Sequence, residues 1–287
     1  MNSNKTIYGI IGNPLKHTLS PVMHNTAFKA LGVDAEYKAF PLQEDELDDF
    51  FKKLKSPDSP IFGLNVTVPY KEKVLKYMDT LTPLVEKLKA VNTIVISRDR
   101  KLVGYNTDAP GFLTHLTELG FDFSDKRVAI MGAGGSARAI LTTLCLIPER
   151  PKSITIYNRT SSRLDTMLSE ISEYIDISIV ETAMSIDDLN IELADLLINT
   201  TSLGLREDDP VLVEEELLHS NMLVYDLIYN PAKTTLLQMA EARGARVSNG
   251  LGMLFYQGVL ALQHWAEDVD ITEKIKMDMR EALEDAA

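Results

Sequence analysis

The chain has 287 residues, 45% of them hydrophobic, and its 29 basic and 42 acidic side chains leave a net charge of −13 at pH 7. This length suits two domains, each large enough to bury a core of its own. A surface this negative repels nucleic-acid phosphates and anionic lipids, so we expect neither nucleic acid nor a membrane as a partner.

Export and membrane insertion are not expected either. Every apolar run is shorter than the roughly 20 residues that cross a bilayer. The N-terminal segment MNSNKTIYGIIG does not place basic before apolar residues, as a signal peptide does. Cys145, the one cysteine, cannot form an internal disulfide and lies in an apolar run typical of a buried thiol. These features favour a cytoplasmic protein.

The first part of the chain alternates strand-like and helical patterns. The expected strands are residues 6–12, 35–42 and 61–68, and the expected helices are residues 21–31, 44–54 and a segment after Pro69. Arg98-Asp99-Arg100 lies between two further strand-like runs and predicts a hairpin, hence an antiparallel edge. This order predicts an α/β unit with a mainly parallel sheet that ends near Asp108.

From Lys126 the alternation restarts with the strand RVAIM, a glycine loop and a helix. Further strand-like runs follow at 153–160, 177–182, 194–204, 222–231 and 245–250, with helices at 161–174 and 234–243. In the tail from Leu251, Leu254 and Leu262 belong to an apolar helical stripe that must cover a surface. We therefore expect domains 1–108 and 109–251, with helices in 252–287 packing back on the first.

The loop GAGGSA follows a buried-looking strand and opens a helix, the context in which Gly-x-Gly-x-x-Gly/Ala binds a dinucleotide. The first glycine allows a tight turn, and the second lets the main chain approach a pyrophosphate. The helix N-terminus then presents free N–H groups to the phosphates. The predicted cofactor-binding residues in this loop are Gly132, Ala133, Gly134, Gly135, Ser136 and Ala137.

The end of the next strand discriminates between the two nicotinamide dinucleotides. An NAD site places an acidic side chain there for the ribose 2′-hydroxyl, whereas this strand ends in Asn158, Arg159 and Thr160, with Arg163 following. Guanidinium groups bind a 2′-phosphate that a carboxylate would repel, and Arg159 can also lie flat on the adenine. The pattern favours NADP and leaves NAD possible.

The segment GNPLKHTLSPVMHN contains more hydroxyl groups than a helix start needs. Ser20 before Pro21 is typical of an N-cap, but Thr18 and Ser20 could equally bind a ligand. His17 and His24 lie seven residues apart with no cysteine or carboxylate cluster beside them, so we expect no metal site.

Several separated segments together resemble the shikimate dehydrogenase family, including the quinate/shikimate dehydrogenases. They are GNPLKHTLSPVMHN, GLNVTVPYKE, AVNTI, GYNTDAPGF, GAGGSARAI, NRT, VYDLIYNPAKTTLL and NGLGMLFYQG. They run in the family's order and cover nearly the whole chain. The resemblance implies an N-terminal α/β substrate domain, a Rossmann-type NADP-binding domain and a substrate cleft between the two.

The resemblance also implies an activity, the NADP-linked reduction of 3-dehydroshikimate to shikimate in aromatic amino-acid biosynthesis. Lys71 and Asp108 match the family's catalytic pair. Hydride transfer to a ketone builds negative charge on oxygen, and an ammonium held beside a carboxylate can stabilise that charge and supply a proton.

The remaining site residues come from the same comparison with the family's motifs. The substrate-binding residues that it implies are Thr18, Ser20, Thr67, Asn92, Tyr229 and Gln257. The residues implied on the nicotinamide side are Thr201, Gly250 and Met253. Amide and hydroxyl groups suit a polyol carboxylate because each can donate and accept hydrogen bonds.

Three positions depart from the commonest family pattern. Thr18 stands where serine is usual, Lys89 stands where glycine is usual before Ala-Val-Asn, and Ser136 stands where alanine is frequent. Only Thr18 bears on substrate, because its extra methyl group changes the shape of the pocket around the carboxylate.

Two rival functions therefore stay open. One is a quinate/shikimate dehydrogenase that uses NAD or NADP, and the other is a non-catalytic regulator that binds NADP or a shikimate-like metabolite. Keeping both Lys71 and Asp108 argues against the regulator, which needs no proton-handling pair. Either a monomer or a homodimer is compatible with the sequence.

Overall fold

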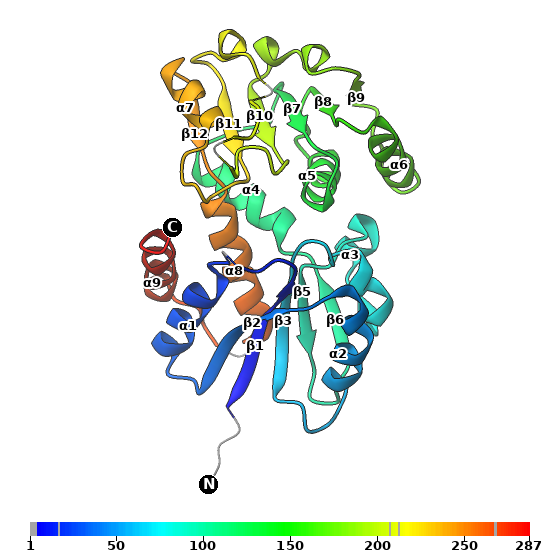
Figure 1. The fold of residues 1–287 in the computed structure, drawn as a ribbon, viewed down its shortest axis with the longest axis vertical. Coiled ribbons are helices and arrows are strands. Elements are labelled where there is room, and N and C mark those ends of the chain that lie inside the picture. The colour runs from blue at the N-terminus through cyan, green and yellow to red at the C-terminus, as the bar shows by residue number, and fades with distance from the viewer. Residues whose placement is uncertain (1–4, 17, 207, 212, 267–268) are drawn as a thin grey trace. The chain divides into compact units, whose positions relative to one another are not determined.

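The computed structural model describes residues 5–16, 18–206, 208–211, 213–266 and 269–287 (Figure 1). These residues divide into two compact units. Unit 1 comprises the described residues of Met1–Gly111 and Leu254–Ala286, and unit 2 those of Phe112–Met253. The chain crosses between the units inside the helices α4 (Asp108–Glu118) and α8 (Leu251–Trp265). Each unit is described by itself below.

The sheet of unit 1 has both parallel and antiparallel pairs. Its strands are, in spatial order, β2 (Ala35–Pro41), β1 (Thr6–Gly12), β3 (Ile61–Val66), β5 (Thr93–Ile96), β6 (Leu102–Tyr105) and β4 (Thr80–Leu81). β1 pairs in parallel with β2 and β3, whereas β5 is antiparallel to β3 and β6. The hairpin expected around Arg100 is therefore confirmed, and Arg100 takes the left-handed turn conformation with φ of 64°.

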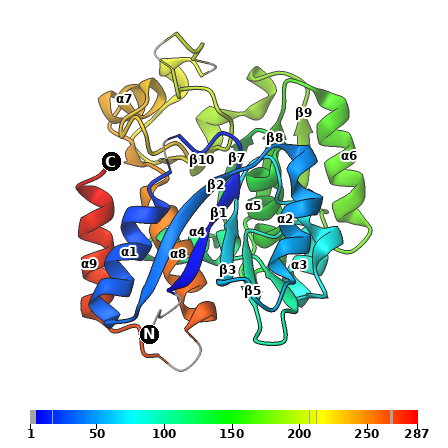
Figure 2. The ribbon, with the colours of Figure 1, turned by 60° about the horizontal axis from the view of Figure 1, so that its bottom comes forward.

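Helices cover both faces of this sheet. They are α1 (Ser20–Leu31), α2 (Leu47–Leu54), α3 (Pro83–Leu88), most of α8, α9 (Glu273–Glu284) and the 3₁₀ helices η1 (Glu44–Glu46) and η2 (Lys73–Tyr77). Phe51 of α2 and Val85 of α3 pack with Leu64 and Ile94 of the strands in one apolar cluster. Figure 2 shows α1, α8 and α9 together beside β1 and β2.

The C-terminal tail contacts this first sheet. The indole N–H of Trp265, at the end of α8, donates to the carbonyl of Ile94 over 3.1 Å. Gly63 makes room for that indole, since a Cβ there would lie 2.3 Å from its Nε1. The tail therefore completes the core of unit 1.

Two local expectations are wrong. Ser20 is the first residue of α1 instead of its N-cap, a position taken by Leu19, and no side chain caps the helix. The segment after Pro69 forms a turn and the short 3₁₀ helix η2 instead of an α-helix. Lys71 therefore lies in an irregular loop, where its side chain is not restricted to a helix surface.

The sheet of unit 2 is parallel throughout. Its strands are, in spatial order, β9 (Val180–Ala183), β8 (Ser153–Tyr157), β7 (Arg127–Met131), β10 (Leu196–Asn199), β11 (Leu223–Asp226) and β12 (Arg246–Ser248). This is the strand order of a dinucleotide-binding sheet, with the order reversing between β7 and β10. Ligands of such sheets bind at the carboxyl ends of the strands next to the reversal.

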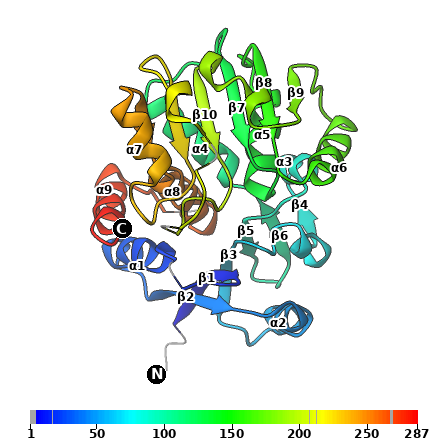
Figure 3. The same ribbon diagram turned by 45° about the horizontal axis from the view of Figure 1, so that its top comes forward.

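Successive strand residues of unit 2 alternate between two apolar layers. Its helices are most of α4, α5 (Gly135–Leu146), α6 (Ser161–Ser172), α7 (Thr235–Ala242) and the 3₁₀ helices η3 (Asp187–Leu189), η4 (Ile191–Leu193) and η5 (Glu215–Leu217). Ile130 and Ile198 pack toward α4, α5 and α6, whereas Ala129 and Leu197 pack toward α7. Figure 3 shows the sheet of unit 2 with α7 and α5. Cys145 is buried in the first layer, where burial raises its thiol pKa to about 11.

Candidate active site

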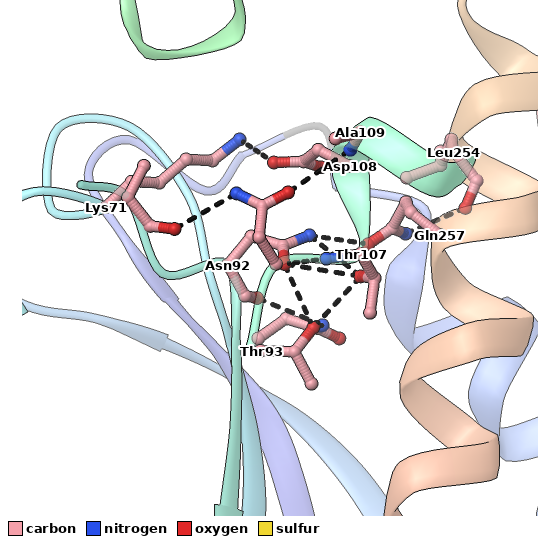
Figure 4. A network of polar contacts seen from close by, with 11 residues as sticks. Lys71, Asn92, Thr93, Thr107, Asp108, Ala109, Leu254 and Gln257 are labelled. Carbon is pink, nitrogen blue, oxygen red and sulfur yellow. Dashed lines mark hydrogen bonds and ion pairs between the residues drawn. The ribbon is translucent and has the colours of Figure 1, made fainter. Parts of the chain in front are cut away.

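A lysine and an aspartate form a close ion pair in unit 1. Lys71 Nζ lies 2.7 Å from Asp108 Oδ2, and their side chains are only 13% and 10% exposed (Figure 4). Lys71 comes from the loop after β3, and Asp108 is the first residue of α4. Reduced solvent access strengthens the attraction within such a pair, which orients the ammonium group.

Two amides lie beside this pair. Asn92, just before β5, donates from Nδ2 to Thr107 Oγ1 over 2.9 Å and to Gln257 Oε1 over 3.4 Å (Figure 4). Its Oδ1 accepts the Thr107 amide N–H over 2.6 Å. Gln257, on α8, donates from Nε2 to the carbonyl of Leu254. The structure therefore brings together four of the residues that sequence comparison implies, namely Lys71, Asn92, Asp108 and Gln257.

A second layer of buried polar side chains, Asn65, Thr93 and Tyr37, supports Asn92. Asn65 of β3 donates to the Asn92 carbonyl and to Thr93 Oγ1, and it accepts the Tyr37 hydroxyl over 2.6 Å. Sequence reasoning missed this layer. An asparagine inside the apolar run IFGLNV is a signal that could have found it, because a buried amide requires partners.

The hydroxyl-rich segment also lies in unit 1. Ser20 is buried and hydrogen-bonded to Tyr37, and Thr18 is half-buried with its Oγ1 3.4 Å from the Ser20 amide nitrogen. Thr67 packs against Gly12, where a Cβ would lie 2.4 Å from the Thr67 methyl carbon. His17 lies outside the described residues.

His24 belongs to the core of unit 1. It is fully buried, stacks on Tyr37 with ring centroids 4.5 Å apart, and lies against Trp265 at 5.2 Å. Burial lowers its pKa to about 3. Within the described part of the chain, no three His, Cys, Asp or Glu side chains gather as metal ligands would, and no helix is long and apolar enough to span a membrane.

The glycine loop of unit 2 has the backbone that a pyrophosphate requires. Gly132 has φ of 110°, and a Cβ there would lie 2.4 Å from Thr200 Oγ1. A Cβ on Gly134 would meet nothing within 4 Å, so this face of the loop is open for a ligand. No side chain caps α5 at Gly134, which leaves its first N–H groups available to phosphate. The loop therefore fits a dinucleotide.

The end of β8 carries the expected positive charge. Arg159, Thr160 and Arg163 are exposed, and Asn158 donates to the Thr160 carbonyl over 2.9 Å. Neither guanidinium group forms an ion pair with a described carboxylate, so both can neutralise a phosphate. The remaining implied residues of unit 2 lie at other strand and helix ends. Thr201 follows β10 and Tyr229 follows β11, whereas Gly250 precedes α8 and Met253 lies in its first turn.

Comparison with known proteins shows the family of the chain. A family model described as the shikimate dehydrogenase substrate binding domain matches residues 10–94, and one described as shikimate / quinate 5-dehydrogenase matches residues 115–221. The chain is 39% identical over 288 residues to a shikimate dehydrogenase (NADP(+)) of Methanopyrus kandleri, covering 99% of this chain and 96% of the relative. The chain belongs to the shikimate dehydrogenase family.

Solved structures of shikimate dehydrogenases share the fold of the whole chain. The shikimate dehydrogenase of Thermus thermophilus in complex with NADP(H) and shikimate is 30% identical, with a TM-score of 0.84 and coverage of 98% of this chain and 100% of that one. A ligand-free 5-ketofructose reductase of a Gluconobacter strain is 31% identical, with a TM-score of 0.82 and coverage of 99% of both chains. The family's fold therefore also occurs in a reductase named for another ketone.

Proposed function

We propose that the protein reduces 3-dehydroshikimate to shikimate with NADPH, reversibly, in the shikimate pathway of aromatic amino-acid biosynthesis. The observation that carries this proposal is the Lys71–Asp108 ion pair, held beside the amides of Asn92 and Gln257. Membership in the shikimate dehydrogenase family and the NADP(+)-dependent relative support it. We further propose that unit 1 binds the substrate and that unit 2 binds the dinucleotide.

NADPH supplies the hydride that the ketone carbon accepts. Lys71 directs its ammonium group at the ketone oxygen, stabilises the negative charge that builds there and donates the proton that completes the alcohol. Asp108 holds the ammonium group in place through the 2.7 Å ion pair. In the reverse direction Lys71 takes the proton back from the shikimate hydroxyl.

The polar side chains of unit 1 are proposed to hold the ring substituents. Asn92, Gln257 and Thr67 would bind hydroxyl groups, because each can both donate and accept a hydrogen bond. Thr18 and Ser20 would donate to the substrate carboxylate near the N-terminus of α1, whose dipole favours an anion. Tyr229, in unit 2, is proposed as a further substrate contact solely because it matches a tyrosine of the family's motif.

The cofactor is proposed to be NADP, with NAD as the alternative. The loop Gly132–Ala137 would bind the pyrophosphate, and Arg159 and Arg163 the 2′-phosphate, with Asn158 and Thr160 contributing neutral donors. Thr201, Gly250 and Met253 are proposed to contact the nicotinamide half. The absence of an acidic side chain at Asn158–Thr160 supports NADP, since nothing there would bind a free 2′-hydroxyl as a carboxylate does.

Quinate is the main alternative substrate. It differs from shikimate by a hydroxyl group on the ring carbon that carries the carboxylate, and that carbon would lie beside Thr18. The deciding experiment compares kcat/KM for shikimate and quinate with NADP and NAD, in all four combinations, and includes 5-ketofructose with NADPH. Dominant turnover of shikimate with NADP is expected. Turnover of none of these substrates would overturn the proposal, and dominant turnover of quinate or 5-ketofructose would reassign the substrate.

We extend the proposal to the cellular location and the assembly of the protein. Cys145 is the single cysteine of the chain, so an internal disulfide cannot form. This supports a cytoplasmic enzyme. A monomer or a homodimer is proposed as the active form.

A further inference from the structure

Strand β11 ends in two polar side chains that are completely buried. Tyr225 and Asp226 both have 0% exposed surface and lie at the carboxyl end of β11, where the loops of a dinucleotide-binding sheet meet their ligand. Successive side chains of a strand point to opposite faces, so the two reach different segments. Neither belongs to the site described above.

Asp226 accepts three hydrogen bonds from two connecting segments. Oδ1 accepts the Ile228 amide N–H and Asn199 Nδ2, each over 3.0 Å, and Oδ2 accepts the Thr234 hydroxyl over 2.7 Å. No described lysine, arginine or histidine pairs with this carboxylate. Burial raises its pKa, so keeping the group costs folding free energy that an apolar side chain would not cost.

The hydrogen bond from Asn199 links Asp226 to the loop after β10. Asn199, the last residue of β10, accepts both the amide N–H and the hydroxyl of Thr201 through Oδ1, over 3.0 and 2.7 Å. Its Nδ2 also donates to the Leu203 carbonyl. Asp226 thereby orients, through one asparagine, the loop that carries the proposed nicotinamide contact Thr201.

The second contact of Asp226 extends to the turn before α8. Ile228, held by Asp226 through its amide, accepts the Gly250 amide N–H at its carbonyl over 3.2 Å. A Cβ on Gly250 would lie 2.0 Å from the Leu227 carbonyl oxygen, so the two segments approach as closely as glycine permits. The position of Gly250 is thus determined by the residues that follow Asp226.

Tyr225 supports the first turn of α8 from the other face of the strand. Its hydroxyl accepts the Met253 amide N–H and lies 2.7 Å from His115 Nδ1. A Cβ on Gly252 would lie 2.1 Å from the His115 ring, so the ring contacts the helix backbone directly. The Tyr225 hydroxyl therefore holds the Met253 backbone in the first turn of α8.

We propose that Tyr225 and Asp226 are positioning residues for the nicotinamide half of the cofactor. Together they fix the three segments that carry Thr201, Gly250 and Met253, without touching the cofactor themselves. This inference rests on the proposed binding of NADP by unit 2. Because Arg159 and Arg163 lie just after β8 and on α6, outside this hydrogen-bond network, the adenosine end should bind independently of Tyr225 and Asp226.

The first test replaces Asp226 and compares the two halves of the cofactor. In Asp226→Ala, kcat with shikimate and NADP should fall about 100-fold, as expected for a reacting group displaced by about 1 Å. The Kd of NADPH should rise, whereas the Kd of 2′,5′-ADP, which lacks the nicotinamide, should stay at the wild-type value by calorimetry. Asp226→Asn keeps an oxygen that accepts from Asn199 and Ile228, and its amide group can donate to the Thr234 hydroxyl oxygen. This variant should therefore retain most of the wild-type activity.

A matched control separates positioning from general stabilisation. Asp195, just before β10, also accepts hydrogen bonds in this sheet, from the Arg127 amide N–H and Lys126 Nζ, but at the amino ends of the strands. Asp195→Ala should lower the melting temperature and leave kcat and both Kd values unchanged. Equal losses of 2′,5′-ADP and NADPH affinity in Asp226→Ala, or a kcat loss in Asp195→Ala as large as in Asp226→Ala, would overturn the inference.

Tyr225→Phe provides a second test that removes one oxygen from a fully buried ring. We expect kcat to fall about tenfold, the size of one lost hydrogen bond, with the 2′,5′-ADP affinity retained. Unchanged kcat in Tyr225→Phe would remove Tyr225 from the inference. A wild-type protein that turns over neither shikimate nor quinate would refute the proposed function, whereas an active wild type with equally active variants would refute only the positioning role.

Discussion

Lys71 Nζ and Asp108 Oδ2 meet over 2.7 Å although the two residues are 37 positions apart in the chain. The irregular loop after β3 supplies one partner and the first residue of α4 supplies the other. A pair that is mostly shielded from water, yet not completely buried, retains access to a substrate oxygen. The same contact made on the surface would contribute little to stability and nothing to orientation.

Replacing Lys71 by alanine should abolish most of the turnover and leave binding intact. The ammonium group acts on charge that develops during hydride transfer, so we expect kcat to fall roughly 10²- to 10⁴-fold with a nearly unchanged KM for shikimate. Steady-state kinetics measure both. Lys73→Ala is the matched control, because Lys73 is exposed and, among the described carboxylates, pairs with Glu44 alone. A higher KM at normal kcat would make Lys71 a binding residue.

Hydrophobic alternation predicts much of the fold but not the contacts of the site. The strand and helix runs and the hairpin at Arg100 follow from local pattern, and the parallel sheet of unit 2 follows from its β–loop–α order. Periodicity does not show that β5 pairs with β3, a long-range arrangement that places Asn65 beside Thr93. Lys71 and Asp108 are recognisable only through their motifs.

The supporting layers are the part that local sequence patterns do not predict. Asn65, Tyr225 and Asp226 lie inside apolar strands, where residue type alone indicates burial and says nothing of the partner. Their partners come from distant segments, such as Asn65 with Tyr37 and Asp226 with Asn199. A buried polar residue in a strand is thus a usable signal for a hydrogen-bond network, but the structure is needed to identify the other residues of that network.

Replacing Arg159 by alanine should discriminate between the two dinucleotides. Arg159 is exposed at the end of β8 with no ion-pair partner among the described carboxylates, so its charge is available to a 2′-phosphate. We expect the KM for NADP to rise at least about tenfold, the equivalent of about 1.4 kcal/mol, with little change for NAD. Arg150→Ala, which removes an arginine already paired with Asp176, should change neither value. Equal losses for both dinucleotides would refute the 2′-phosphate assignment.

Replacing Lys89 by glycine should stabilise the protein. Lys89 ends α3 in the left-handed conformation with φ of 53°, which strains a side chain that carries a Cβ and which glycine adopts freely. We expect the free energy of unfolding to increase by about 1 kcal/mol, measured by denaturant titration. Lys87→Gly, inside the same helix, should instead destabilise by a similar amount. A destabilised Lys89→Gly variant would show that a contact of the lysine side chain outweighs the backbone strain.

Acid should destabilise the protein through His24. Burial among Tyr37 and Trp265 lowers the folded-state pKa of His24 to about 3, whereas the unfolded chain keeps a value near 6.5. Between these values the unfolded state binds a proton that the folded state does not, so stability falls as pH falls, by up to about 1.4 kcal/mol per pH unit. Unfolding titrations from pH 7 to pH 4 should show a smaller slope in His24→Leu, which cannot take up this proton. Identical slopes in the two proteins would assign the acid sensitivity to carboxylates instead.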